Sequence, residues 1–416
     1  MANNNDNKVL NVPPLRFPEF SGEWKMCTIG ELTTKVGSGV TPRGGEAVYK
    51  TEGHPFVRSQ NVGLGNLLLD DIAFIDEETH LRQKNTELQF NDVLLNITGA
   101  SIGRSALVDK QIVGGNVNQH VCIIRTKENL VPSFICSFLL SNYGQRQIDS
   151  FQAGGNRQGL NFEQIKSIKI TIPSKDEQIK IAKLLRAIDE RIATQNKIIE
   201  KLQSLIKGLV DSLLENPSWE KVYLLSFMQF YSTNSLSWEQ LSYSNGNVRN
   251  LHYGLIHGFQ TSMIDSTLLP RILPNYQPKQ YTVCQDGDVA FADASEDTNE
   301  IGKAIEFSNT IDVKTVCGLH TIHGRDIKQN TILGFKGFAF NSRYFHDQVR
   351  RLAQGTKVYS ITAKNLSSCY VYIPDMIKQE NVVRLLNAYE ENLSLNRTLL
   401  NKYEIQKQYL LQQMLI

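Results

Sequence analysis

The chain has 416 residues, of which 41% are hydrophobic and 21% charged, and its formal net charge is only +2. These values are ordinary for a globular protein of two or three domains, and they exclude binding of an anionic partner through the field of the whole molecule. No apolar run approaches the ~20 residues that span a bilayer, and the six cysteines include no CxxC pair. We therefore expect a cytoplasmic protein with reduced thiols that makes no use of a membrane.

The first part of the chain is predicted to be a polar tail followed by a mixed domain. The opening MANNNDNK is not a signal peptide, and we expect residues 1–14 to be a disordered tail. Residues 15–174 carry short runs rich in Val, Ile, Phe, Tyr and Thr, cut by Gly, Asn and Asp, as strands joined by loops require. Helical pieces such as Pro132 to Phe151 interrupt them. This pattern predicts an α+β domain.

A long helix is predicted next, over residues 175–215. Its apolar residues follow alternating steps of four and three, with one break at Gln195; they are Ile181, Leu185, Ile188, Ile192, Ile199, Leu202, Ile206, Leu209 and Leu213. This spacing is an a/d seam of the coiled-coil kind, in which a polar residue midway can fix the register. A helix of about 40 residues would be ~60 Å long, and it cannot bury such a seam alone.

The following segment, residues 216–375, repeats the organisation of the first at offsets of 195 to 201 positions. Both segments open on a tryptophan, Trp24 or Trp219. Both carry an Asp-Val strand, a polar loop and an Ile-Gly-basic triplet, NDVLLNITGASIGR in one and GDVAFADASEDTNEIGK in the other. A strand-like run with His120 or His320 follows, and each segment closes on Ile-Pro. We infer that one α+β scaffold has been duplicated and that its loops have diverged.

A second long helix is predicted over residues 376–416. Aligned without a gap on the two Ile-Pro pairs, 201 positions apart, it keeps the steps of the first helix through Val382, Leu386, Tyr389, Leu393, Leu400, Tyr403, Leu410 and Met414. Its breaks are Asn396, at the position that matches Gln195, and Lys407. Because neither helix can bury its seam alone, we expect the two to pack on each other.

Four phrases of the sequence resemble the specificity subunit of type I restriction-modification enzymes. They are LRFPEFSGEW at residue 15, PFVRSQNV at residue 55, GNRQGLNFEQIKSIKITIPSKDEQIKIA at residue 155 and HYGLIH at residue 252. The resemblance implies two target recognition domains that each read one half of a split, asymmetric site in double-stranded DNA. It also implies that the chain catalyses nothing and binds no cofactor. S-adenosylmethionine, ATP and Mg would then belong to two modification subunits and to the restriction subunits of the full complex.

In that family the two helices hold the recognition domains apart and bind the modification subunits. Each domain must then lie at an opposite end of the helix pair, so we expect an antiparallel coiled coil with an internal two-fold repeat. The seam residues are Ile181, Leu185, Ile192, Leu202 and Leu209 on one helix and Val382, Leu386, Leu393, Tyr403 and Leu410 on the other. The apolar residues outside the seam are expected to dock modification subunits; they are Leu184, Ile198, Leu205, Leu385 and Leu399.

The loops of both domains contain side chains that can read bases. Arg binds guanine in a bidentate manner, and Asn or Gln does the same to adenine. The candidates are Arg43, Arg58, Gln60, Asn61, Arg157 and Gln158 in the first domain and His257, Arg271 and Lys357 in the second. Each can instead contact a phosphate or only solvent, and Arg58, Arg157 and Gln158 are the strongest of them.

The sequence offers three other interpretations. The phrase ENPSW, which ends at Trp219, resembles the Asn-Pro-Pro-aromatic motif of DNA amino-methyltransferases, but KVGSGVTP lacks the strand–Gly-x-Gly–helix context of a cofactor loop. His320 and His323 suggest a metal, yet residues three apart in a strand point to opposite faces and no third ligand is evident, so we predict no metal site. A coiled-coil adaptor for protein partners is a further alternative, which salt-dependent DNA binding would decide against.

Overall fold

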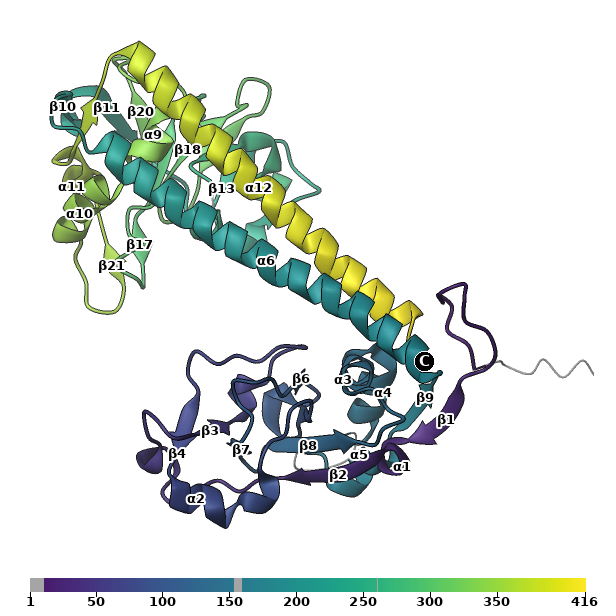
Figure 1. Cartoon of the computed structure of the whole chain (residues 1–416). Helices are drawn as coiled ribbons and strands as arrows, with labels where there is room; N and C mark the ends of the chain where they lie inside the picture. Colours follow the sequence, from purple (N-terminus) through teal and green to yellow (C-terminus); the bar gives the residue numbers. More distant parts are fainter. Residues whose placement is uncertain (1–10, 153–158, 260) are drawn as a thin grey trace, which may run out of the picture. The chain divides into compact units, whose positions relative to one another are not determined.

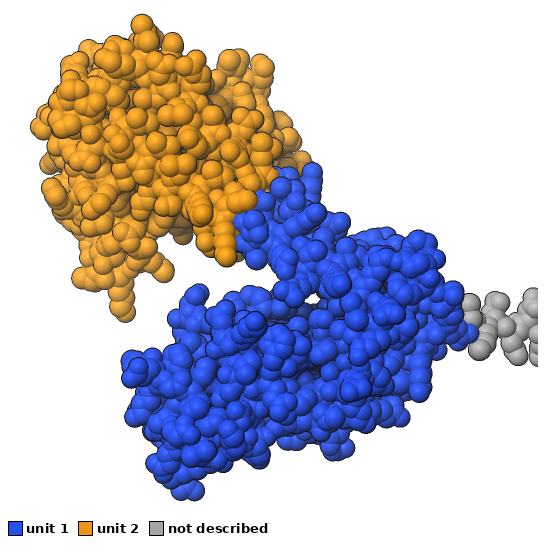
Figure 2. Space-filling view, in the orientation of Figure 1, with its two compact units in different colours: residues 1–196, 398–416 blue, residues 197–397 orange. Residues whose placement is uncertain are grey.

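The computed structural model describes residues 11–152, 159–259 and 261–416, and it divides into two compact units (Figures 1 and 2). Unit 1 comprises residues 1–196 and 398–416, and unit 2 comprises residues 197–397. Each unit therefore holds one mixed domain together with a part of each long helix. Within the described ranges, no helix has the length and apolar character needed to cross a membrane.

The domain of unit 1 is built on two small sheets. The first has the order β2-β8-β5-β6, all antiparallel, with bounds Thr33–Ser38, Val121–Thr126, Val93–Asn96 and Ser105–Leu107. The second has the order β4-β3-β7, with bounds Ala73–Ile75, His54–Val57 and Asn116–Val117. A separate antiparallel pair joins β1 (Lys25–Thr28) to β9 (Lys169–Ile172). The helices are α1 (Ile29–Leu32), α2 (Glu77–Arg82), α3 (Pro132–Leu140), α4 (Asn142–Ser150) and α5 (Phe162–Ser167).

Strand β5 is buried on both of its faces. Val93 and Leu95 face one apolar core, which includes α3 and the long helices, while Leu94 faces a second core on the other side of the sheet. A strand that is buried on both faces reads as a continuous apolar run. The sheet therefore separates two cores within one unit.

Unit 2 repeats this plan, and each of its two sheets has one strand more. One sheet has the order β11-β20-β16-β18-β14, with bounds Met228–Tyr231, Thr321–Asp326, Val289–Ala292, Ala304–Ser308 and Met263–Asp265. The other has the order β12-β15-β13-β19, with bounds Leu241–Ser242, Arg271–Ile272, Arg249–Leu251 and Thr315–Cys317. Two pairs are β10 (Glu220–Tyr223) with β22 (Tyr370–Ile373) and β17 (Ala294–Ser295) with β21 (Tyr359–Ser360). The helices are α7 (Leu224–Phe227), α8 (Tyr253–Gly258), α9 (Phe335–Ala339), α10 (Arg343–Leu352) and α11 (Ala363–Ser367).

Matching contacts confirm that the two domains repeat one α+β scaffold. Arg125 donates two hydrogen bonds of 2.7 Å to Asp92, and Arg325 donates bonds of 2.8 and 2.7 Å to Asp288. The predicted Asp-Val anchors of the repeat are therefore the buried acceptors of an arginine on the neighbouring strand.

A second matching contact fixes the start of each long helix. Gln178 accepts a bond from Val131 N and donates to the carbonyls of Asn129 and Pro173. Gln379 makes the same three bonds, with Ile332, Asn330 and Pro374. Each of these buried glutamines therefore attaches the start of its long helix to the loop that precedes α3 in the first domain or α9 in the second.

The long helices are α6 (Lys175–Leu214) and α12 (Met376–Gln413), and they lie side by side in Figure 1. In unit 1, Ile181 and Leu185 share a core with Leu410 and Met414. In unit 2, Val210 at the other end of α6 shares a core with Val382 and Leu386 at the start of α12. The start of each helix thus packs with the end of the other, and the predicted antiparallel arrangement is confirmed within each unit.

Most seam residues are buried to the extent the pattern predicted. Ile181, Leu185, Val382, Leu386, Leu393 and Leu410 are buried, and Ile192, Leu202, Leu209 and Tyr403 are half-buried. The break at Lys407 is occupied by an ion pair, because its Nζ lies 2.6 Å from Asp189 Oδ1. The break at Gln195 is buried in the seam.

Two details differ from the sequence predictions. Leu184 was expected to be free for a partner, but it packs against the core of unit 1, whereas Ile198, Leu205, Leu385 and Leu399 are exposed by 39–44%. Residues 11–14 were assigned to the tail, but Pro13 is buried and Asn11 O accepts a bond of 2.8 Å from Trp24 N. Residues 1–10 lie outside the described residues.

Candidate nucleic-acid interface

Three predicted base readers of the first domain converge on one aspartate, Asp71. The Arg58 guanidinium donates to its backbone oxygen at 2.7 Å and to its carboxylate at 3.3 Å, and Gln60 Nε2 also donates to that carboxylate. Asn61 Nδ2 donates to Asp71 Oδ1 and to Leu68 O, both at 2.9 Å. Asp71 therefore presets the shape of this loop.

The three readers differ in accessibility. Asn61 has no exposed surface, and its Oδ1 accepts from Arg58 N at 2.9 Å, so its amide is fully used within the protein. Its predicted role as a base reader is wrong for this conformation, and we assign it to positioning of the loop. The Arg58 side chain is 15% exposed and lies over the Tyr49 ring, while Gln60 is exposed. Arg58 and Gln60 remain candidates.

The other loops of the first domain gather at the same end of the sheet. Asn96, the last residue of β5, donates to Ser59 O at 2.8 Å and so holds the Arg58 loop. Thr98 Oγ1 lies 2.6 Å from His120 Nδ1, and Thr98 also forms a bridge to Gly159. Arg157 and Gln158, which precede Gly159, lie outside the described residues. Thr98 thus connects Gly159 to His120.

Arg43 belongs to the same surface. It is exposed in a turn after β2, and this turn is held because Thr41 N donates to Gln119 Oε1 at 2.9 Å. Gln119 Nε2 lies 3.2 Å from the His120 ring. His120 therefore contacts Gln119, which holds the Arg43 turn, and Thr98, which pairs with Gly159. Sequence reasoning treated it only as an anchor of the repeat.

The second domain presents a run of rings at the equivalent place. Ring centroids are 4.6 Å apart for Trp238 and His252, 4.7 Å for His252 and Tyr253, and 5.2 Å for Tyr253 and His320. The predicted reader His257 joins this run, because its ring lies 6.1 Å from that of Tyr253. Burial, with the nearby charge of His320, lowers the pKa of His252. The ring of His252 is therefore held neutral in this cluster.

The loop of Lys357 lies against the same cluster. Ile361 N donates to Asp293 O at 2.9 Å, and β21 pairs with β17, so the exposed Lys357 is carried next to residues 293–295. Asp293 lies 3.2 Å from His320 Nδ1, and burial raises the pKa of this carboxyl against the opposing effect of the histidine. His257, His320 and the Lys357 loop are thus brought together, although the sequence separates them widely.

Arg271 lies elsewhere, on β15 beside Arg249 of β13. Burial and then the charge of Arg271 lower the pKa of Arg249. The pair is a local concentration of positive charge, of the kind that suits a phosphate. Arg249 was missed because a lone arginine in a strand carries no recognisable signal.

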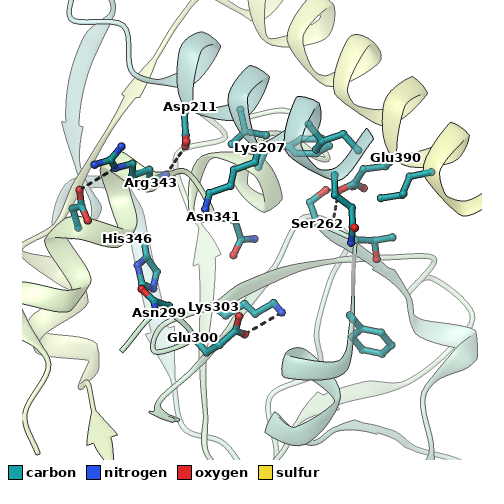
Figure 3. Close-up of a pocket in the computed structure, with 18 of the residues that line it drawn as sticks. Lys207, Asp211, Ser262, Asn299, Glu300, Lys303, Asn341, Arg343, His346 and Glu390 are labelled. Carbon is teal, nitrogen blue, oxygen red and sulfur yellow. Dashed lines mark hydrogen bonds and ion pairs between the residues drawn. The ribbon is translucent and has the colours of Figure 1, made fainter. Parts of the chain in front are cut away.

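A cavity of about 590 Å³ lies where both long helices meet the second domain (Figure 3). Several of its charged side chains have partners: Asp211 Oδ1 accepts a bond of 2.7 Å from the main-chain N of Arg343, and Lys303 lies 3.1 Å from Glu300. Ser262 donates two bonds to Glu390, and burial raises the pKa of this carboxyl to about 7. This arrangement suits a junction between helices and domain rather than a reaction centre.

The phrase that resembles a methyltransferase motif has a structural explanation. Asn216 Oδ1 accepts from Ser218 N at 3.1 Å and from Ser218 Oγ at 2.7 Å. The segment is the turn that follows α6 and leads to Trp219, where Trp219 N donates to Asn216 O. The Asn-Pro pair therefore ends a helix.

Comparison with known proteins relates this fold to one family. Residues 21–204 match the family model described as type I restriction modification DNA specificity domain. A Methanocaldococcus jannaschii protein named as the MjaX type I restriction enzyme specificity subunit is 20% identical over 96% of this chain and 94% of its own length. The Escherichia coli EcoKI specificity subunit is 22% identical over 46% of this chain and 41% of its own length.

A solved structure has the same fold over nearly the whole chain. It is the S subunit of the type I restriction-modification system of M. genitalium, with a TM-score of 0.59 and 14% identity over 97% of this chain and 99% of that one. Its agreement in fold extends across both repeats and both long helices. Over residues 21–204 in sequence, and over nearly its whole length in fold, the chain is therefore similar to the specificity subunits of type I restriction-modification systems.

Proposed function

We propose that each domain of this chain reads one half of a bipartite, asymmetric site in double-stranded DNA. Arg43, Arg58 and Gln60, with His120, form the reading surface of the first domain. Tyr253, His257, His320 and Lys357 form that of the second, and Arg271 with Arg249 contacts the phosphate backbone. The chain catalyses nothing itself.

This proposal is supported mainly by one observation: the two domains share the same buried contacts but expose different side chains. The Asp92–Arg125 and Asp288–Arg325 pairs, and the two helix-start glutamines, are the same in both domains. At the equivalent end of the sheet, one domain presents Arg and Gln and the other presents rings. A fixed scaffold with variable loops is what two different half-sites require.

We further propose that the long helices set the spacer between the half-sites and dock two modification subunits. Ile198, Leu205, Leu385 and Leu399 are exposed apolar residues on the long helices, which supports a role as contact residues. Restriction subunits complete the full complex. S-adenosylmethionine, ATP and Mg are bound by these partners in the cytoplasm, and this chain binds none of them.

The test is to co-express the chain with a cognate modification subunit and to sequence the methylome of the cells. We expect methylated adenines in one bipartite motif with a fixed spacer. The purified complex should lose DNA affinity steeply as salt is raised, because lysine and arginine contacts release counterions. Methylation by the isolated chain would contradict the proposal, and a complex without sequence-specific DNA binding would support a protein adaptor instead.

A further inference from the structure

The core of the second domain brings two thiols and an imidazole together. Cys284, Cys317 and His323 are 2%, 3% and 1% exposed, and their two sulfurs and a ring nitrogen all lie within 4.8 Å of one another. The two sulfurs are 3.7 Å apart. No third ligand for the His320–His323 pair is evident from the sequence, because the cysteines that lie beside His323 come from segments distant in the chain. His320 takes no part in this cluster.

The orientation of His323 leaves one nitrogen for a ligand. Nε2 lies 2.7 Å from Asp288 Oδ2, and Arg325 holds that same carboxylate with two bonds. Nδ1 is buried and has no hydrogen-bond partner in the described part of the chain. A neutral imidazole that donates through Nε2 carries its lone pair on Nδ1, and a buried acceptor without a partner is costly. Histidines that bind metals commonly donate their other N–H to a carboxylate in this way.

The first domain shows that packing alone does not require these three residues. Leu88 N donates to Gly115 O as Cys284 N donates to Thr315 O, and Ile123 pairs with Leu94 as His323 pairs with Ala290. The equivalent residues in the first domain are Leu88, Val117 and Ile123, which share one apolar core. The Asp–Arg pair is present in both domains. At these three positions the first domain has apolar side chains, and the second domain has side chains of types that can bind a metal. The neighbouring aspartate is the same in both domains.

We propose that Cys284, Cys317 and Nδ1 of His323 bind a thiophilic divalent ion, for which zinc is the best fit. Two thiolates at ~2.3 Å from a tetrahedral zinc ion are ~3.8 Å apart, close to the observed sulfur separation. Two thiolates balance the charge of the ion, so the site is neutral and suits an apolar core. The fourth tetrahedral position is left to a non-protein ligand. The ion ties β19, in one sheet of the domain, to β20 in the other.

The experiment is metal analysis of the purified full chain by inductively coupled plasma mass spectrometry. We expect close to one zinc per chain, and cobalt exchange should give thiolate-to-cobalt charge-transfer absorption. A variant carrying Cys284→Leu, Cys317→Val and His323→Ile adopts the residues of the first domain and should lose the metal while keeping its circular dichroism. Asp288→Asn should weaken zinc affinity by about 10–100-fold. Cys122→Val, in the core of the first domain, should change neither.

Three results would overturn the proposal: no metal above the level of the triple variant, undiminished metal in that variant, or a Cys284–Cys317 disulfide. The disulfide is detected as two thiols that resist alkylation in denaturant without reductant. Should the triple variant fail to fold, X-ray absorption of the wild-type zinc protein decides. A ligand shell of two sulfurs at ~2.3 Å and nitrogen at ~2.0–2.1 Å supports the site, and a shell without sulfur refutes it.

Discussion

Asp71 links three side chains that the sequence presents as independent readers. The phrase VRSQN identifies residue types that can bind bases, but it does not show that Asn61 is wholly buried or that one carboxylate holds the other two. The position of Asp71, ten residues later in an irregular loop, has no periodicity that would place it there. The type of each residue was therefore predictable, and its exposure was not.

Replacing Arg58 with alanine tests whether this residue contacts a base. If Arg58 binds guanine, Arg58→Ala should cost ~1–3 kcal/mol of binding free energy and relax one base position, because a bidentate contact is lost. Quantitative binding to a library of site variants measures both. Asn61→Ala should instead weaken all sequences together and lower the stability of the domain. A uniform loss from Arg58→Ala would reduce that residue to a phosphate contact.

The buried pair Glu306–Lys336 gives a second prediction at this scale. Their charged atoms lie 3.2 Å apart with 0% and 3% of the side chains exposed, where the first domain has Leu107 and Ile135. Lys336→Ile alone leaves a buried carboxylate without its cation and should destabilise the protein by ~3–5 kcal/mol. Adding Glu306→Leu should recover most of that loss. Denaturant unfolding of both variants is the measurement, and equal losses would contradict the prediction.

The long helices are the elements that the sequence predicted best. Their apolar seam is a local property of a period close to 3.5, so it survives without knowledge of the fold. Leu184 was misplaced because the domain of unit 1 covers that side of α6, and heptad spacing carries no information about contacts outside the helix pair. The short strands were harder to assign, since β5 is buried on both faces and shows no alternation.

Lengthening both helices should lengthen the DNA spacer. Four residues inserted near Gln195, with a matched insertion near Asn396, add ~6 Å of helix, which corresponds to one to two base pairs at ~3.4 Å each. We expect two unchanged half-sites separated by a longer spacer in the methylome. Four alanine substitutions at exposed positions of the same region are the control. An unchanged spacer would show that the helices do not set this distance.

The contact between α12 and the second domain should make stability depend on pH. The pKa of Glu390 is raised to about 7, above the ~4.3 of a free glutamate, because burial disfavours its charge. The folded state therefore holds a proton that the unfolded state releases, so the free energy of unfolding should fall as pH rises from ~4.3 to ~7. Glu390→Gln keeps the contact with Ser262 and should be more stable than wild type at pH 8 by ~1–3 kcal/mol.

The measurement is thermal unfolding of the wild-type protein and the Glu390→Gln variant at pH 5 and at pH 8. Glu391→Gln removes the same formal charge from an exposed neighbour on α12 and controls for net charge. A glutamine variant no more stable than wild type at pH 8 would mean that the carboxyl is charged at little cost in the folded state.

At the scale of the whole molecule, the duplication predicts that the two proposed recognition domains can be exchanged. Replacing residues 15–174 with the first domain of one of the specificity subunits that this chain resembles should change one half-site and leave the other unchanged, as read from the methylome. The incoming domain must keep apolar residues against Leu410 and Met414, which belong to the core of unit 1. A matched exchange of residues 216–375 should change the other half-site only. Changes in both half-sites from one exchange would contradict modular recognition.

The duplication was visible in the sequence because its anchors have structural reasons that allow little change. The Asp–Arg pairs and the glutamines that hold the helix starts are buried polar contacts, and such groups require their partners. Surface loops carry no such requirement, so the proposed reading surfaces diverged beyond what an internal alignment can follow. The Cys284–Cys317–His323 cluster could not be predicted from the sequence, because its members come together only in the folded protein.

The sharing of α12 between the two units bears on how the protein is made. Leu410, Leu411, Met414 and Leu415 complete the core of the unit whose other residues begin the chain. During synthesis, the whole of unit 2 therefore emerges from the ribosome before the last segment of unit 1 does. The first domain must wait, with the apolar side of α6 uncovered, for roughly 200 further residues, or about 10–40 seconds at ~5–20 residues per second. Chaperones, or early capture by a modification subunit, would find that surface open during this interval.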